Sequence, residues 1–299
     1  MEFTTVMIFL KDVFASLLVL FMMASPFTQS TAVSYEAERP DELIASFAVV
    51  SDIHVETNNP ASYENFSDLL YGIKAGEDID AVVYTGDNVM NGQVAEDFLF
   101  YSGVRAVKPA KENIVLPGNH DFGNSDGDYA QLREKYLFNN AFYLGNVIKT
   151  DYYYKVVNGC YIINLTSEDT TTWEFRMSEE QFTWLEDVLK EAKEAEAPIF
   201  VFNHYPLRYL KDNDPSRLAD LLNEYGVEFF VHGHIHNDMG ADNFYTSYGV
   251  KCINLPRATE VTEYDAGDGI VVEVYENEVV VRARDFIKGE WIDGLRYTY

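Results

Sequence analysis

The chain has 299 residues, of which 47% are hydrophobic and 15% aromatic, so it can bury a large core and is not a disordered chain. It carries 22 Lys and Arg against 49 Asp and Glu, a formal net charge of −27. Because such a surface repels phosphate backbones, we expect no nucleic-acid polymer as a partner. The two cysteines, Cys160 and Cys252, form no C-x-x-C motif, which excludes a thiolate zinc site and a disulfide scaffold. The sequence leaves undecided whether these two cysteines form a single disulfide.

The N-terminus has the pattern of an export signal. The apolar segment 13–24 has 12 residues, fewer than the about 20 that a helix needs to cross a bilayer. Ser30 and Ala32 are the small residues that a signal peptidase reads. We interpret residues 1–32 as a signal peptide of a secreted or cell-envelope protein; the alternative is an uncleaved membrane anchor through residues 13–24. Residues 33–45 then form a polar linker, and residues 46–299 form one domain.

Five short apolar runs follow, at 47–50, 81–84, 114–116, 199–202 and 229–231. Runs of this length are typical of strands that are buried on both faces. Helix-like segments separate them, at 63–74, 94–106, 178–194 and 215–225. This alternation predicts an α/β fold with parallel strands.

Two hairpins indicate that the sheets also contain antiparallel strands. One joins residues 152–157 and 160–165 through Asn158-Gly159, a strong hairpin signal, and the other joins 270–275 and 279–284. We therefore expect mixed sheets, packed together with helices outside.

Polar residues that can bind metals follow all five apolar runs, and all six histidines of the chain lie in or just after their ends. Ligands bind at this edge of open α/β sheets. Asp52 and His54 are two residues apart, as are His234 and His236, so on a strand each pair would share one face. The candidate ligands are Asp52, His54, Asp87, Asn119, His204, His234 and His236. Seven donors exceed one tetrahedral site, so we expect two ions that share the Asp87 carboxylate.

These residues form motifs that resemble the calcineurin-like metallophosphoesterases. The motifs are, in order, Asp52-x-His54, Gly86-Asp87, Gly118-Asn119-His120-Asp121, a lone His204 and Gly233-His234-x-His236. The resemblance covers residues 47–237 and implies a four-layer α/β/β/α sandwich with two packed mixed β-sheets and a dinuclear metal centre. It implies one ion bound by Asp52, His54, Asp87 and His236, and a second bound by Asp87, Asn119, His204 and His234.

The same resemblance assigns catalytic roles to the residues that follow Asn119. His120 would be a catalytic residue and Asp121 the group that orients it. His232 has no counterpart in the family pattern, and we interpret it as a packing residue behind the ligands. Met90 stands where purple acid phosphatases carry a tyrosine, so an iron–tyrosinate centre is not expected. The remaining pattern resembles the small-substrate branch, which includes cyclic-nucleotide phosphodiesterases.

The expected activity is hydrolysis of small phosphodiesters or phosphomonoesters, with diesters slightly favoured. Two divalent ions (Mn²⁺, Fe²⁺ or Zn²⁺, the sequence does not choose) would supply a bridging hydroxide near neutral pH. His120 would protonate the leaving oxygen as general acid. The alternative is a non-catalytic metal-binding or scaffolding protein on the same fold. The sequence leaves the physiological substrate and the oligomeric state open.

Overall fold

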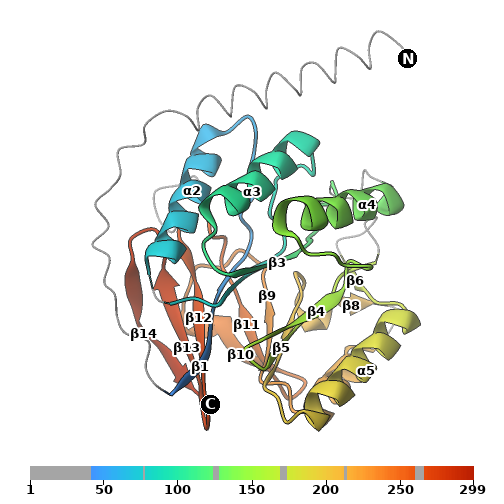
Figure 1. Cartoon of the computed structure of the whole chain (residues 1–299). Coiled ribbons are helices and arrows are strands. Elements are labelled where there is room, and N and C mark those ends of the chain that lie inside the picture. The colour runs from blue at the N-terminus through green and yellow to red at the C-terminus, as the bar shows by residue number, and fades with distance from the viewer. Residues whose placement is uncertain (1–41, 77, 124–127, 169–173, 212–213, 260–265) are drawn as a thin grey trace.

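The computed structural model describes residues 42–76, 78–123, 128–168, 174–211, 214–259 and 266–299 (Figure 1). The expected signal peptide or anchor and most of the expected linker lie outside these residues. Within the described ranges, no helix is both long and apolar enough to cross a membrane.

The first sheet contains the strands that follow the N-terminal segment and those at the C-terminus. Its order is β14-β13-β12-β1-β2-β3, in which β1, β2 and β3 are parallel and the others antiparallel. The strands are β1 (Leu43–Val50), β2 (Ala81–Thr85), β3 (Glu112–Leu116), β12 (Asp268–Tyr275), β13 (Val279–Asp285) and β14 (Glu290–Thr298).

The second sheet is also mixed, with the order β10-β11-β9-β7-β5-β4. Its centre, β11-β9-β7-β5, is parallel, and an antiparallel strand flanks it on each side. The strands are β4 (Tyr153–Val157), β5 (Cys160–Asn164), β7 (Ile199–Phe202), β9 (Phe229–His232), β10 (Phe244–Ser247) and β11 (Val250–Asn254). Two short strands, β6 (Phe175–Arg176) and β8 (Leu210–Lys211), pair separately.

The two sheets pack face to face, and helices cover their outer faces. Phe47 of the first sheet meets Phe200 of the second with ring centroids 5.0 Å apart, inside a core to which both sheets contribute. Apolar residues of α2 (Pro60–Ala75), α3 (Val94–Val107) and α4 (Tyr129–Asn139) pack on the first sheet. Those of α5 (Glu179–Glu194) and α6 (Pro215–Glu224) pack on the second. The fold is the expected four-layer α/β/β/α sandwich (Figure 1).

Most predicted elements are confirmed, with differences at their ends. The hairpin at Asn158-Gly159 pairs Val157 with Cys160, and β12 pairs with β13 as expected. β1 begins at Leu43 because Leu43 and Ala45 already pair with β12, so the expected linker ends before Leu43. Cys160 and Cys252 are both free and buried, and burial raises the pKa of each thiol to about 12.

Candidate metal centre

The predicted ligands lie beyond the ends of their strands, not on them. β1 ends at Val50 and β9 ends at His232, so strand alternation does not align Asp52 with His54 or His234 with His236, and that part of the prediction is wrong. Instead Asp52, His54, Asp87, His234 and His236 all adopt left-handed backbone conformations, with φ between 49° and 70°. Such conformations are uncommon outside glycine and cluster at functional sites. Here they turn all five side chains toward one place.

Hydrogen bonds between loops hold this conformation. The amide of Asp52 donates to the carbonyl of Gly86 (3.0 Å) and that of His54 donates to the carbonyl of Asp87 (2.9 Å). Between the two sheets, the amide of His234 donates to Oδ2 of Asp52 (3.1 Å). The site is therefore assembled from the carboxyl ends of strands in both sheets.

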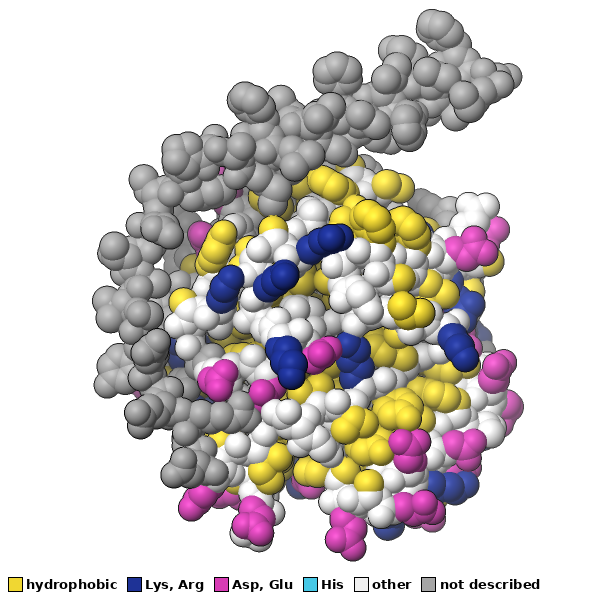
Figure 2. Space-filling view, viewed as in Figure 1, with side chains coloured by type: hydrophobic (Ala, Val, Ile, Leu, Met, Phe, Trp, Pro, Cys, Tyr) yellow, Lys and Arg dark blue, Asp and Glu magenta, His cyan; other side chains and the backbone are white. Residues whose placement is uncertain are grey.

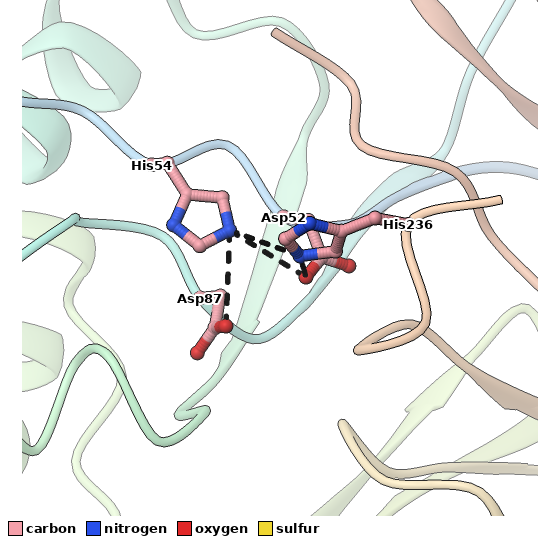
Figure 3. Close-up of side chains that lie close together, drawn as sticks. All are labelled: Asp52, His54, Asp87 and His236. Atoms are coloured by element: carbon pink, nitrogen blue, oxygen red, sulfur yellow. Dashed lines mark hydrogen bonds and ion pairs between the residues drawn. The ribbon is translucent and has the colours of Figure 1, made fainter. Parts of the chain in front are cut away.

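The first cluster consists of Asp52, His54, Asp87 and His236, whose ligand atoms all lie within 4.8 Å of one another. Figure 3 shows these four side chains with their polar atoms turned toward a common centre. Nε2 of His236 lies 2.7 Å from Oδ1 of Asp52 and 3.3 Å from Nε2 of His54. Nε2 of His54 lies 3.8 Å from Oδ2 of Asp87.

The second cluster consists of Asp87, His204 and His234. Nε2 of His204 lies 3.2 Å from Oδ2 of Asp87 and 3.2 Å from Nδ1 of His234. The other ring nitrogen of His204, Nδ1, donates to the carbonyl of Thr85 (3.1 Å), which turns Nε2 toward Asp87. Asp87 belongs to both clusters.

The electrostatics of the site keep the carboxylates ionised. Burial alone would raise the pKa of Asp52, but hydrogen bonds from His236 and His54 outweigh it and hold the pKa well below 3.8. Burial is likewise outweighed at Asp87, where the charge of His204 and its hydrogen bond lower the pKa to about 2. Burial lowers the pKa of His54, and lowers that of His234 to about 4. Burial would lower the pKa of His204, but the charge and hydrogen bond of Asp87 outweigh it and raise that pKa to about 9, so a bound cation would displace a proton from this ring. Carboxylates and imidazoles together form a donor set that suits a transition-metal cation.

Two glycines of the motifs allow the loops to approach this closely. A Cβ on Gly118 would lie 2.2 Å from Oδ1 and 2.5 Å from the backbone nitrogen of Asp87. A Cβ on Gly233 would lie 1.9 Å from Oγ of Ser51 and 2.2 Å from Oδ2 of Asp52. Both motif glycines are therefore required by close packing against the ligands.

His120 lies beside the shared ligand, with Nε2 3.9 Å from Oδ2 of Asp87 and its side chain 15% exposed. Its Nδ1 donates to the carbonyl of Met90 (2.6 Å), which fixes the ring and leaves Nε2 facing the centre. This carbonyl belongs to the residue that replaces the tyrosine of purple acid phosphatases.

Asp121 does not orient the His120 ring as expected. Its carboxylate accepts hydrogen bonds from the amides of Gly118 (2.7 Å) and Asn88 (3.1 Å), because the chain turns back after His120 and directs Asp121 toward those loops. Burial, with the nearby charge of Asp87, raises the pKa of Asp121 to about 7. Asp121 braces the loops that carry Asp87 and His120.

Asn119 is buried between two residues that adjoin Asp87, since Gly118 packs against Asp87 and the amide of His120 donates to Oδ1 of Asp87 (2.9 Å). His232 is fully enclosed: its Nδ1 donates to the carbonyl of Gly233 (2.8 Å) and its Nε2 accepts from the hydroxyl of Tyr245 (2.6 Å). Burial lowers the pKa of His232 to about 3. It supports the loop of His234 from behind.

Arg257 lies within electrostatic reach of the site, although the sequence favours a solvated surface residue over a contact to substrate phosphate at this position. It follows β11. Burial lowers the pKa of His236, the hydrogen bond and charge of Asp52 outweigh burial and raise this pKa, and the positive charge of Arg257 opposes that rise. Its Nε is buried and has no hydrogen-bond partner among the residues described. No sequence motif marks Arg257, because only the packing of β11 beside β9 brings it near His236.

Both clusters fit divalent cations. A ring nitrogen of His54 faces one of His236 at 3.3 Å, and a ring nitrogen of His204 faces one of His234 at 3.2 Å. Two imidazole nitrogens at such a distance, with carboxylates beside them, are favourable where a proton or a cation lies between them. Asp52, His54, Asp87 and His236 would hold one ion, and Asp87, His204 and His234 a second.

The fold and the paired clusters define a metallophosphoesterase. The family model described as calcineurin-like phosphoesterase matches residues 45–238, and the chain belongs to this family. No curated protein matches the chain.

Solved structures show the same fold at low sequence identity. A dimetal phosphatase from Danio rerio is 16% identical, with a TM-score of 0.62 over 86% of this chain and 98% of its own. A purple acid phosphatase from yellow lupin seeds is 14% identical, with a TM-score of 0.58 over 85% of this chain and 53% of its own. GAP50, titled the anchor in the inner membrane complex of Plasmodium, is 15% identical, with a TM-score of 0.57 over 85% of this chain and 87% of its own.

Proposed function

We propose that this chain hydrolyses small phosphodiesters or phosphomonoesters, with diesters favoured, using two divalent cations of the Mn²⁺, Fe²⁺ or Zn²⁺ type. The observation that carries the proposal is the position of Asp87, whose Oδ2 lies 3.2 Å from His204 and 3.8 Å from His54. One carboxylate thus serves both clusters. When bound, such a cation pair lowers the pKa of coordinated water toward neutrality and neutralises charge on phosphoryl oxygens.

His120 has the geometry of the general acid. The carbonyl of Met90 holds its Nδ1–H, so the second nitrogen, Nε2, is the one that delivers a proton to the leaving oxygen. The ring is 15% exposed, which lets a substrate reach it from solvent. Asp121 keeps the loop of His120 in place through the amides of Gly118 and Asn88.

Arg257 supplies a positive charge for the substrate. Its charge acts on His236, and guanidinium groups bind phosphate through directed N–H donors. We expect Arg257→Ala to raise KM more than it lowers kcat.

The test combines metal titration with hydrolysis of chromogenic mono- and diesters by the metal-free and reconstituted protein. Asp87→Asn is expected to abolish binding of the second ion and to lower turnover at least 100-fold. Asp187→Asn, at a side chain that is 73% exposed on α5, is the matched control and is expected to behave as wild type. If the wild type binds two ions but hydrolyses neither ester class with any of the three metals, the proposal is wrong and the chain is a non-catalytic metal-binding protein.

We also propose that the protein is exported through residues 1–32, which lie outside the described residues. The expected mature chain begins at residue 33. N-terminal sequencing of protein recovered from the medium and from washed membranes tests this. An intact residue 1 in the membrane fraction would support the anchor instead.

A further inference from the structure

Two segments of this acidic protein that pack against each other contain no acidic residues. Residues 98–111 and 135–149, here called the α3–η1 surface, contain five Lys or Arg and no Asp or Glu. At the chain average of 49 acids in 299 residues, these 29 residues would carry about five. The segments belong to α3, the end of α4 and the turn η1 (Asn140–Leu144). Their basic residues are Arg105, Lys108, Lys111, Lys135 and Lys149.

Large apolar side chains project from the same surface. Phe138 is 61% exposed and Phe142 57% exposed, and their rings stack at 5.4 Å with an interplanar angle of 10°. Val147 nearby along the chain is 86% exposed. Clustered exposed apolar groups mark interaction sites. In Figure 2, yellow and dark blue side chains lie together over the region of α3 and α4, while magenta ones are most numerous along the lower part of the molecule and also appear at the right edge and near the centre of the view.

The fold holds these groups in this position. Tyr143 packs inward against Tyr101, with ring centroids 5.9 Å apart, so the next residue back, Phe142, points outward. Arg105 donates to the carbonyl of Phe142 (3.0 Å), and its guanidinium lies 5.8 Å from the Phe142 ring. The outward aromatic pair is therefore anchored to α3.

The acids that border the surface are largely neutralised. Asp97 is buried and pairs with Lys135 (2.6 Å), and Glu112 pairs with Lys155 (2.6 Å). Glu134 is exposed one helical turn before Phe138 and lies at the border of the α3–η1 surface. Because the Debye length at physiological salt is about 8 Å, the acids on distant faces do not cancel the local positive charge.

Most of the surface lies at the opposite edge of the sheet from the metal centre; the exception is Lys135, which pairs with Asp97 and donates to the carbonyl of Gly92 near the loop of His120. Lys111 directly precedes β3, and β1, β2 and β3 run parallel in register, so their starts share one edge. The metal ligands follow the ends of these strands. The chain before Glu42 joins the domain at the starting edge, through β1.

We propose that the α3–η1 surface docks on an anionic lipid bilayer. Aromatic rings favour the interface between headgroups and acyl chains, and lysine and arginine side chains bind anionic headgroups. The remaining acidic faces are repelled by the same bilayer, so the domain docks in one orientation, with the metal centre turned toward water. If residues 13–24 stay attached, they tether the domain at the edge that docks.

The test uses the full, metal-loaded chain and a local probe, so that any insertion of residues 13–24 does not obscure the result. Val147→Cys is labelled with an environment-sensitive fluorophore; both natural cysteines are buried. Tyr248→Cys, at a 53% exposed residue between β10 and β11, is the control position. Vesicles with 30% phosphatidylglycerol are expected to shift the Val147 label to the blue, reversibly with salt, and to leave the Tyr248 label unchanged. Pure phosphatidylcholine vesicles are expected to shift neither.

Three double substitutions test which side chains contribute to vesicle binding. Lys108→Glu with Lys111→Glu is expected to weaken partitioning at least 30-fold, at about fivefold for each lysine lost. Lys193→Glu with Lys251→Glu, on α5 and β11, makes the same change in net charge and is expected to have an effect below threefold. Phe138→Ser with Phe142→Ser is expected to weaken partitioning at least tenfold, with circular dichroism and ester hydrolysis unchanged.

Three results would overturn the proposal. One is equal shifts of both labels, or shifts on phosphatidylcholine alone. Another is equal weakening by the two lysine pairs. The third is a shift of the Val147 label that grows with protein concentration in the absence of vesicles, which would assign the surface to a second copy of the chain.

Discussion

Gly118→Ala tests whether Asp87 is the ligand shared by both ions. The added methyl group would lie 2.2 Å from Oδ1 and 2.5 Å from the backbone nitrogen of Asp87. Carbon and a neighbouring heavy atom need about 3.5 Å, so Asp87 or the Gly118 loop must move by about 1 Å. Because the second contact is with backbone, a change of rotamer cannot relieve it, and we expect about 1–3 kcal/mol of lost stability.

We expect Gly118→Ala to lower metal affinity and turnover more strongly than it lowers stability. A displacement of about 1 Å at a supporting residue costs about 10–100-fold in metal affinity and about 100-fold in rate. Metal affinity is measured by titration of the metal-free protein, and turnover with a chromogenic diester at saturating metal. Gly240→Ala is the control, since a Cβ there meets nothing within 4 Å. Wild-type metal affinity and turnover in Gly118→Ala would refute the shared role of Asp87.

Three further predictions use other parts of the structure. His120→Asn should keep both ions and lose about 100- to 10,000-fold in kcat on alkyl esters, but much less on nitrophenyl esters, whose leaving group needs no proton; equal losses would contradict the acid role. Tyr245→Phe should lower the free energy of unfolding by about 1–3 kcal/mol in urea, because it leaves Nε2 of buried His232 without its donor; no change would contradict the contact. Burial raises the pKa of Asp97 to about 6, so its ionisation costs stability above pH 6, and that cost disappears as the pH falls toward 4. Relative to Asp97→Asn, the wild type should gain about 1–3 kcal/mol between pH 7.5 and 4.5 in urea titrations, and a constant difference would contradict the assignment.

Elements with strong local signals could be predicted. The capping residue Ser178 and the apolar stripe of α5 predict that helix to within a residue of its start. α4 has a weaker signal: only Tyr136 and Asn139 of its described side chains are buried, and the other apolar residues that pack on the first sheet, such as Leu132, are only half-buried. β14 was missed for the same reason, since most of its residues are exposed or half-buried at the edge of the first sheet.

The candidate site could likewise be predicted only in part. Which residue types bind the metals can be read from the motifs, because carboxylates and imidazoles after buried strands have few structural roles. How they converge cannot, since strand alternation predicts the wrong geometry for Asp52 and His54. Their left-handed backbone is sustained by the hydrogen bonds to the loop of Gly86 and Asp87, which lies more than 30 residues away in the chain.

The order of residues along this chain was enough to determine its family, its layered α/β architecture and the chemistry of its ligands. All three depend on local patterns, namely hydrophobic runs and the polar residues that end them. Only the tertiary structure decided the partners of each ligand, the hydrogen bonds by which Asp121 holds its neighbouring loops, the influence of the Arg257 charge on His236 and the α3–η1 surface. These depend on contacts between segments distant in sequence, which form because two sheets must bury their apolar faces against each other.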